Sequence, residues 1–266
     1  MKITGLITKM ITEYADPVQY FLNLDNEIIM MNQLLGKQVK IRFNHYQCLN
    51  CGQDKEIYAM GFCKNCYFIS PHAGEWVVRP ELSKAHLGIA DRNLEFEQEA
   101  QLQPHIVYLA CSGGVKVGVT RKSQLPTRWI DQGAEYAVKL AQTDNRYEAG
   151  LIETALKQHI SDKTNYRKML SQDTPYIDLN EKKQELSAFV PADLQHFILE
   201  DDEITKLHYP VISYPLGIQS VNLKKDYEIK GRLIGIKGQY LLFDNNLVIN
   251  LRSHEGFVVD WEVQGC

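Results

Sequence analysis

Long apolar runs and low-complexity tracts are both missing from this chain. The opening residues, Met1 to Gly5, do not lead into the apolar core of a signal peptide, and no segment is apolar enough to predict a membrane-spanning helix. The composition, 44% hydrophobic and 23% charged over 266 residues, is typical of a folded soluble protein with two or three modules. We therefore expect a cytoplasmic protein without a membrane partner.

Cysteine is sparse, and its spacing does not favour disulfides. Of six cysteines, Cys48 and Cys51 form one C-x-x-C pair, and Cys63 and Cys66 form a second pair eleven residues later. This spacing is typical of four thiolates on one tetrahedral Zn²⁺, and it leaves no open position for a catalytic water. We predict a structural zinc site, with the nearby His72 as a surface residue.

An excess of positive charge is also missing, since the net charge is −4. The charge is unevenly distributed: residues 104–171 hold ten Lys/Arg against six Asp/Glu, which gives this stretch +4 and leaves −8 for the rest. A basic module inside an acidic chain suits a locally held phosphate ligand. By charge alone, a solvated helical surface explains the same pattern equally well.

The two ends of the chain both alternate apolar and polar residues between turn residues, which predicts strands. We expect residues 1–43 to be an N-terminal β segment that pairs with a C-terminal β segment, 209–266, in one β-rich domain. Between them we predict a zinc module with its connector at 44–103, a small mixed α/β domain at 104–171 and an acidic helical connector at 172–208. The fold class is therefore α+β. Two unrelated β segments are the alternative at the termini.

The segment 104–171 contains a short hairpin followed by two helices in the sequence pattern. Residues 106–110 and 115–119 are β-branched strands around a Ser-Gly-Gly turn, which brings Tyr108 and Lys116 close on one face. A helix is expected over 127–141 with Arg128 in its first turn, and a second over 147–160 with Glu153 at the border of its apolar stripe.

The order Tyr108, Lys116-Val-Gly118-Val-Thr, Arg128, Glu153, Asn165 resembles the GIY-YIG nuclease superfamily, whose α/β domain cleaves phosphodiester bonds with one divalent metal ion. The resemblance implies that Tyr108 activates the attacking water, Arg128 grips the phosphate and Glu153 holds Mg²⁺ or Mn²⁺, with Lys116 and Asn165 completing the catalytic set. Gly118 would permit close backbone approach. The whole chain is also similar to a bacterial family of unknown function that joins a four-cysteine module to a GIY-YIG-like domain.

Two positions differ from the superfamily pattern. Lys116 stands where the second motif has tyrosine, as in the phage-type and restriction-enzyme branches of the superfamily. Gln132 stands where members carry histidine or tyrosine, one helical turn after the arginine. Because an amide does not take up a proton at neutral pH, Gln132 closes one general-base route.

Each candidate also has a purely structural interpretation. Tyr108 would be a core aromatic, Arg128 and Glu153 surface charges or an ion pair, and Asn165 a residue at a helix end. Basic side chains that could meet nucleic-acid phosphates are equally explained as a solvated surface; they are Arg121, Lys122, Lys163, Arg167 and Lys168.

Three functions follow as hypotheses. The first is a nucleic-acid-processing enzyme that cleaves phosphodiester bonds in DNA or RNA. The second is a nucleic-acid-binding module that has lost cleavage, which Gln132 favours. The third is a zinc-organised scaffold that meets a protein partner, for which the β-rich domain offers a surface.

Overall fold

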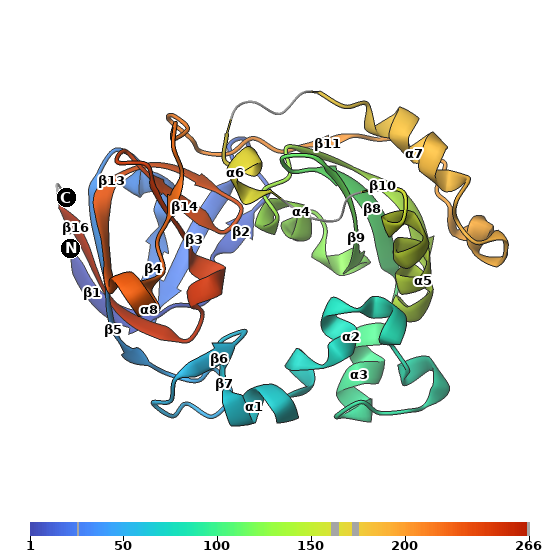
Figure 1. The fold of residues 1–266 in the computed structure, drawn as a ribbon, viewed down its shortest axis with the longest axis horizontal. Helices are drawn as coiled ribbons and strands as arrows, with labels where there is room; N and C mark the ends of the chain where they lie inside the picture. The colour runs from blue at the N-terminus through green and yellow to red at the C-terminus, as the bar shows by residue number, and fades with distance from the viewer. Residues whose placement is uncertain (26, 161–164, 172–175, 265–266) are drawn as a thin grey trace.

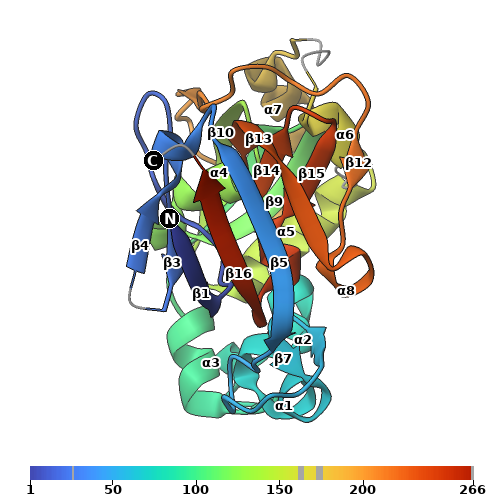
Figure 2. The same ribbon diagram turned by 90° about the vertical axis from the view of Figure 1, so that its left-hand side faces the viewer.

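Strands from both ends of the chain form one large sheet, as the alternating termini predicted. In the computed structural model, which describes residues 1–25, 27–160, 165–171 and 176–264, this sheet has seven strands. Their spatial order is β1 (Lys2–Leu6), β16 (Phe257–Gln264), β5 (Gln38–Tyr46), β13 (Glu228–Lys237), β14 (Tyr240–Phe243), β15 (Leu247–Asn250) and β12 (Gln219–Ser220). Figure 2 shows β1, β16 and β5 side by side, with the two chain ends close together. The expected β-rich domain is confirmed.

A second, three-stranded sheet completes this domain. It is formed by β2 (Ile11–Glu13), β3 (Gln19–Leu24) and β4 (Glu27–Met30) and is followed by the short helix η1 (Met31–Leu34). Tyr20 and Leu24 of this sheet belong to the same buried cluster as Trp261 and Phe243 of the large sheet. The cluster also contains Tyr108, so the core of the β-rich domain continues into the central part of the chain.

The central part is built on a four-stranded sheet with the order β11 (Thr205–Lys206), β10 (Tyr136–Thr143), β8 (His105–Cys111) and β9 (Val115–Arg121). The predicted hairpin is confirmed as β8 and β9, which pair in antiparallel register with Tyr108 opposite Gly118 and Ala110 opposite Lys116. One face of the sheet packs on α5 (Arg146–Lys157) and α7 (Leu179–Ser187) through buried aliphatic side chains. Figure 1 shows these two helices on the outer side of the sheet.

The helix expected over 127–141 is wrong for most of its length. Only α4 (Thr127–Asp131) is helical, and the chain then forms strand β10 beside β8. The helix ends because Gly133 takes a left-handed conformation, with φ of 66°. Side chains of residues 136–143 pack on both faces of the sheet, with Ala137 in one buried cluster and Val138 and Leu140 in another, so burial on a sheet decides their conformation rather than local helical propensity.

The cysteine module and its connector lie below the other two parts in Figure 1. The elements of this region are β6 (Ile57–Ala59), β7 (Phe62–Cys63), α1 (Lys64–Ile69), η2 (Pro71–Ala73), α2 (Glu75–Val78), η3 (Pro80–Leu82), η4 (Ala85–Leu87) and α3 (Leu94–Gln101). The connector is fixed to α5, since a Cβ on Gly150 would lie 2.3 Å from the Glu81 backbone nitrogen. This close packing holds the connector against the central sheet.

The remaining elements link these parts. They are η5 (Lys122–Gln124), α6 (Tyr166–Met169), η6 (Ala192–Phe197), α8 (Leu223–Asp226) and η7 (Leu251–His254). The acidic connector is helical in α7 and η6, and its end at β11 pairs with β10. Within the described ranges, no helix is long and apolar enough to cross a bilayer.

Candidate functional site

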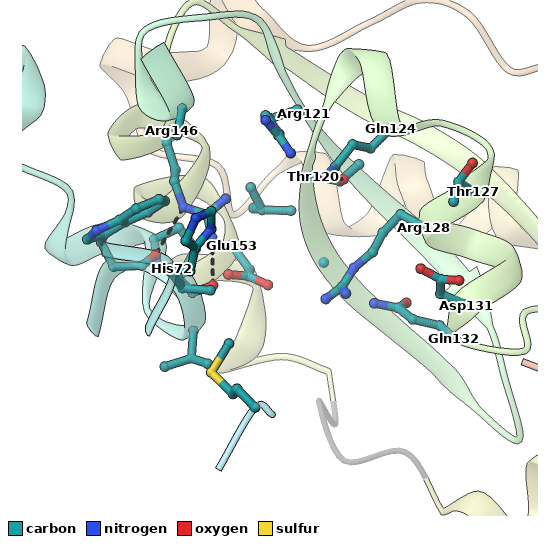
Figure 3. A pocket seen from close by; sticks show the side chains of 18 of the residues that line it. His72, Thr120, Arg121, Gln124, Thr127, Arg128, Asp131, Gln132, Arg146 and Glu153 are labelled. Atoms are coloured by element: carbon teal, nitrogen blue, oxygen red, sulfur yellow. Dashed lines mark hydrogen bonds between the residues drawn. The ribbon is translucent and has the colours of Figure 1, made fainter. Parts of the chain in front are cut away.

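A cavity of about 660 Å³ lies where the three parts of the chain meet. We call it the central cleft. Its walls come from β9, α4 and α5 of the central part, from the connector between His72 and Ala100, and from Met60, Lys9 and Arg252. Figure 3 shows labelled side chains of α4 and α5 directed into this space.

Tyr108 lies behind the cleft and is fully buried. Its hydroxyl occupies the space beside Gly118, where a Cβ would lie only 2.6 Å from the Tyr108 oxygen. Gly118 therefore accommodates the tyrosine of the neighbouring strand, which is a different role from the backbone approach to substrate that was expected. Burial raises the pKa of the Tyr108 phenol, and the nearby Arg128 only partly offsets this.

Gln132 joins Tyr108 to Arg128. It caps α4, one turn after Arg128, and its amide oxygen accepts hydrogen bonds from the Tyr108 hydroxyl at 2.8 Å and from Arg128 Nε at 3.0 Å. This orientation of the amide is the one that satisfies both donors. Gln132 thus fixes the direction of the Arg128 side chain, whose guanidinium points into the cleft in Figure 3.

Lys116 lies on β9 at the floor of the cleft and is 9% exposed. Burial, together with repulsion by Arg128, lowers the pKa of the lysine ammonium to about 8. A lysine with a pKa this close to neutrality can bind an anion as a cation and can also exchange a proton.

Glu153 reaches the cleft from the middle of α5 and is 6% exposed. Its Oε2 lies 3.4 Å from Lys157 Nζ, one helical turn away. Burial raises the pKa of the Glu153 carboxyl, and Lys157 and Arg146 act in the opposite direction. Burial disfavours the charged carboxylate, and the ion pair with Lys157 offsets part of that cost.

Positive charge dominates the walls of the cleft. Seven lysines and arginines line it, against the three carboxylates of Glu99, Asp131 and Glu153. Asp131 is already engaged, because its carboxylate pairs with Lys9 and accepts a hydrogen bond from Gln239 at 2.9 Å. The cleft as a whole therefore favours a polyanionic ligand.

Arg146 is a cleft residue that the sequence analysis did not identify. Its guanidinium donates to the backbone carbonyls of Trp76 at 3.0 Å and Val77 at 2.8 Å and lies over the Trp76 ring. Figure 3 shows Arg146 on the same side of the cleft as His72. Burial lowers the pKa of Arg146 to about 10. These acceptors lie about 70 positions earlier in the chain, so no local pattern could have indicated them.

Several predicted site residues lie elsewhere. Asn165 caps α6 by accepting from the backbone N–H of Arg167 and Lys168, which is the helix-end position considered as its alternative. Arg121 lines the cleft, whereas Lys122, Arg167 and Lys168 are exposed and do not belong to its lining. Lys163 lies outside the described residues. Of the five residues in the predicted catalytic series, the fold brings four together: Tyr108, Lys116, Arg128 and Glu153.

The four paired cysteines form one cluster. The sulfur atoms of Cys48, Cys51, Cys63 and Cys66 all lie within 4.8 Å of one another, close enough to hold one metal ion. Burial would raise the pKa of the Cys48 thiol, but backbone hydrogen bonds, including one from Cys63 N–H at 3.2 Å, lower it to about 6. Burial raises the pKa of the Cys66 thiol in the same cluster to about 12, so the two thiols differ in how readily they ionise without a cation.

Comparisons with known proteins identify one family. A family model described as "Protein of unknown function (DUF2797)" matches residues 36–259, which include the cysteine cluster and the central cleft. No curated protein and no solved structure matches the chain.

Proposed function

The chain belongs to the DUF2797 family, and because that description names no activity, we propose a function from the chemistry of the central cleft. We propose that the protein binds nucleic acid there and cleaves its phosphodiester backbone with the help of a divalent cation. The zinc ion of the cysteine cluster is proposed to be structural.

The observation that carries this proposal is the convergence of Lys116, Arg128 and Glu153 in one basic cavity. These residues span 37 positions of the sequence, from Lys116 to Glu153, and come from three different elements. A phosphodiesterase needs cationic groups for the phosphate, an anchor for a metal ion and a group that exchanges protons. Lys116, Arg128 and Glu153 supply these chemical types.

Glu153 would hold the divalent cation. Mg²⁺ commonly keeps several waters and binds through one or two carboxylates together with substrate phosphate, so one buried carboxylate facing a polyanion-binding cavity suits it. When bound, such a cation would neutralise negative charge on the phosphate oxygens.

The protein's own groups would bind and orient the substrate. Arg128, held by Gln132, would donate to the phosphate oxygens, and Arg121 at the end of β9 would contact a neighbouring phosphate. In hydrolysis a water oxygen bonds to phosphorus, one ester P–O bond breaks, and the leaving oxygen takes up a proton. Lys116 Nζ, with its pKa of about 8, is the group proposed to exchange protons in this reaction. The Tyr108 hydroxyl would act through Gln132 as a positioning group.

A cleavage assay tests this proposal directly. Labelled single- and double-stranded DNA and RNA would be incubated with Mg²⁺ or Mn²⁺, using wild-type protein and Glu153→Gln purified in parallel as the control for contaminating nucleases. We expect cleavage by wild type and a loss of at least 100-fold, roughly the contribution of a key catalytic group, in the variant. Equal cleavage by the two proteins would refute the assignment of Glu153.

A binding module without cleavage is the second candidate, and the ion pair between Glu153 and Lys157 favours it, since Lys157 already partly neutralises the carboxylate. This candidate requires binding that weakens with salt, survives Glu153→Gln and falls with Arg128→Ala, without any cleavage product. A protein that neither binds nor cleaves nucleic acid would contradict both candidates and support the scaffold hypothesis.

A further inference from the structure

We propose that the central cleft selects single-stranded nucleic acid, with phosphates on its basic wall and an unpaired base against an aromatic wall on the connector. This inference rests on the proposed function only in assuming that the ligand is nucleic acid. It adds the class of substrate and the residues that recognise it.

His72 and Phe96 form the aromatic wall, and Trp76, whose ring is buried and lies beneath Arg146, backs it. His72 and Phe96 lie with ring centroids 4.5 Å apart in an edge-to-face arrangement, and Phe96 and Trp76 lie 6.4 Å apart. All three residues line the cleft; His72 is exposed, Phe96 is half-buried and Trp76 is buried. Aromatic side chains of this kind offer stacking surfaces to unpaired bases of any sequence.

We call the side of the cleft formed by β9 and α4, with Lys116, Arg121 and Arg128, the basic wall; Arg128 faces the aromatic wall across the cavity, and Arg146 lies on the aromatic side. Figure 3 shows His72 on one side and Arg128 and Gln132 on the other. A nucleotide has the same division of chemistry, since its phosphate is anionic and its base is flat and largely apolar on both faces. The two walls therefore match the two ends of one nucleotide.

The dimensions favour one strand over a duplex. The cavity holds about 660 Å³, within the range of about 300–1,000 Å³ typical of enclosed sites for small ligands. A duplex keeps its bases stacked inside and is bound on broad surfaces, so its bases could not reach the aromatic wall without being flipped out. An unpaired strand presents its bases directly.

A second cavity extends the cleft. It holds about 600 Å³ between the cysteine module and the β-rich domain, and shares Met60, His72 and Arg252 with the first. Two adjacent cavities with shared lining residues suit a linear polymer better than a compact ligand. A strand that leaves the central cleft past His72 would continue beside Arg252.

Binding measurements test the inference without requiring cleavage. Glu153→Gln protein, without added divalent cation, would be titrated into a labelled single strand, into the same strand annealed to its complement and into the same strand made abasic. We expect at least tenfold tighter binding of the intact single strand than of either competitor. Phe96→Ala should weaken single-strand binding by about 5- to 150-fold, the range for loss of one stacked base.

Two further variants separate recognition from folding. Phe68→Ala removes an aromatic ring that is 56% exposed on the cysteine module outside the cleft lining, and it should leave affinity unchanged. His72→Ala changes an exposed side chain and should weaken binding even if Phe96→Ala lowers stability. The inference would be overturned if the duplex or the abasic strand bound as tightly as the intact single strand. It would also be overturned if neither His72→Ala nor Phe96→Ala weakened binding, or if no strand bound at all. Metal-dependent cleavage without strand preference would leave the proposed function standing, whereas strand preference without cleavage would refute that function alone.

Discussion

Replacing Gly118 by alanine tests the packing that positions the floor of the central cleft. The added Cβ would lie 2.6 Å from the Tyr108 hydroxyl oxygen and 2.7 Å from its Cζ, so the ring must move by roughly 1 Å to restore ordinary contact. Tyr108 is fully buried and packs edge-to-face on Trp129, with ring centroids 5.9 Å apart, which leaves little room for that movement. The hydrogen bond to Gln132 would be strained or lost.

The expected cost follows from these contacts. Overpacking of a core costs about 1–3 kcal/mol and a lost hydrogen bond about 1 kcal/mol, while exchange of glycine for alanine in a strand returns about 0.5–1 kcal/mol. We therefore expect Gly118→Ala to lower the free energy of unfolding by about 1–3 kcal/mol, measured by urea denaturation. Affinity for nucleic acid should fall as well, because Arg128 depends on Gln132.

A double-mutant cycle with Tyr108→Phe makes the test specific. Removing the hydroxyl deletes the closest contact, so Gly118→Ala should cost at least about 0.5 kcal/mol less in that background. Gly217→Ala is the matched control, since a Cβ there meets no atom within 4 Å. Full stability of Gly118→Ala, or strictly additive effects in the cycle, would show that this account of the floor is wrong.

Three other predictions concern charge and metal. The affinity for a labelled strand should fall by about three- to tenfold as the pH rises from about 7 to 9, because Lys116, with its lowered pKa of about 8, is charged below that pH and neutral above it. Lys116→Arg should remove this fall, and a wild-type affinity that does not change with pH would contradict the role of Lys116. Glu135→Ala should destabilise the protein by about 2–4 kcal/mol in urea denaturation, because it leaves the Lys237 ammonium, which is 0% exposed, without the carboxylate that lies 2.7 Å away. Lys237→Met should change the free energy of unfolding by less than about 1 kcal/mol, and equal losses for the two variants would refute the role of this ion pair. Cys63→Ser should abolish bound zinc, measured by elemental analysis, and lower the melting temperature by about 5–10 °C, and unchanged melting would exclude a structural metal there.

Local patterns in the sequence predicted the features that local geometry determines. The two C-x-x-C pairs indicated one cluster, and the Ser-Gly-Gly turn indicated the hairpin that places Tyr108 opposite Gly118. The joint order of Lys116, Arg128 and Glu153 indicated residues that do meet in one cavity. Their roles in catalysis stay predictions.

Features that depend on distant partners could not be predicted. The chain leaves the helix at Gly133 because residues 136–143 are needed as a strand beside β8, a contact that apolar spacing alone cannot distinguish from a longer helix. Asp131 is held by Lys9 and Gln239, which lie more than 100 positions away in opposite directions along the sequence. The aromatic wall was missed for the same reason, since its position depends on how η3 packs on α5.

The buried cluster that contains both Tyr108 and Trp261 has a consequence for how the chain unfolds. Ile106, Tyr108 and Trp129 of the central part share this core with strands from both ends of the chain, so the segment 104–171 cannot keep its apolar face covered when it is cut out. A fragment of that length would expose this face and self-associate, and the intact protein should melt in one cooperative transition for the central and β-rich parts together. The segment 104–171 is therefore not expected to fold or to function as a separate domain, because its buried face is completed by strands from both ends of the chain.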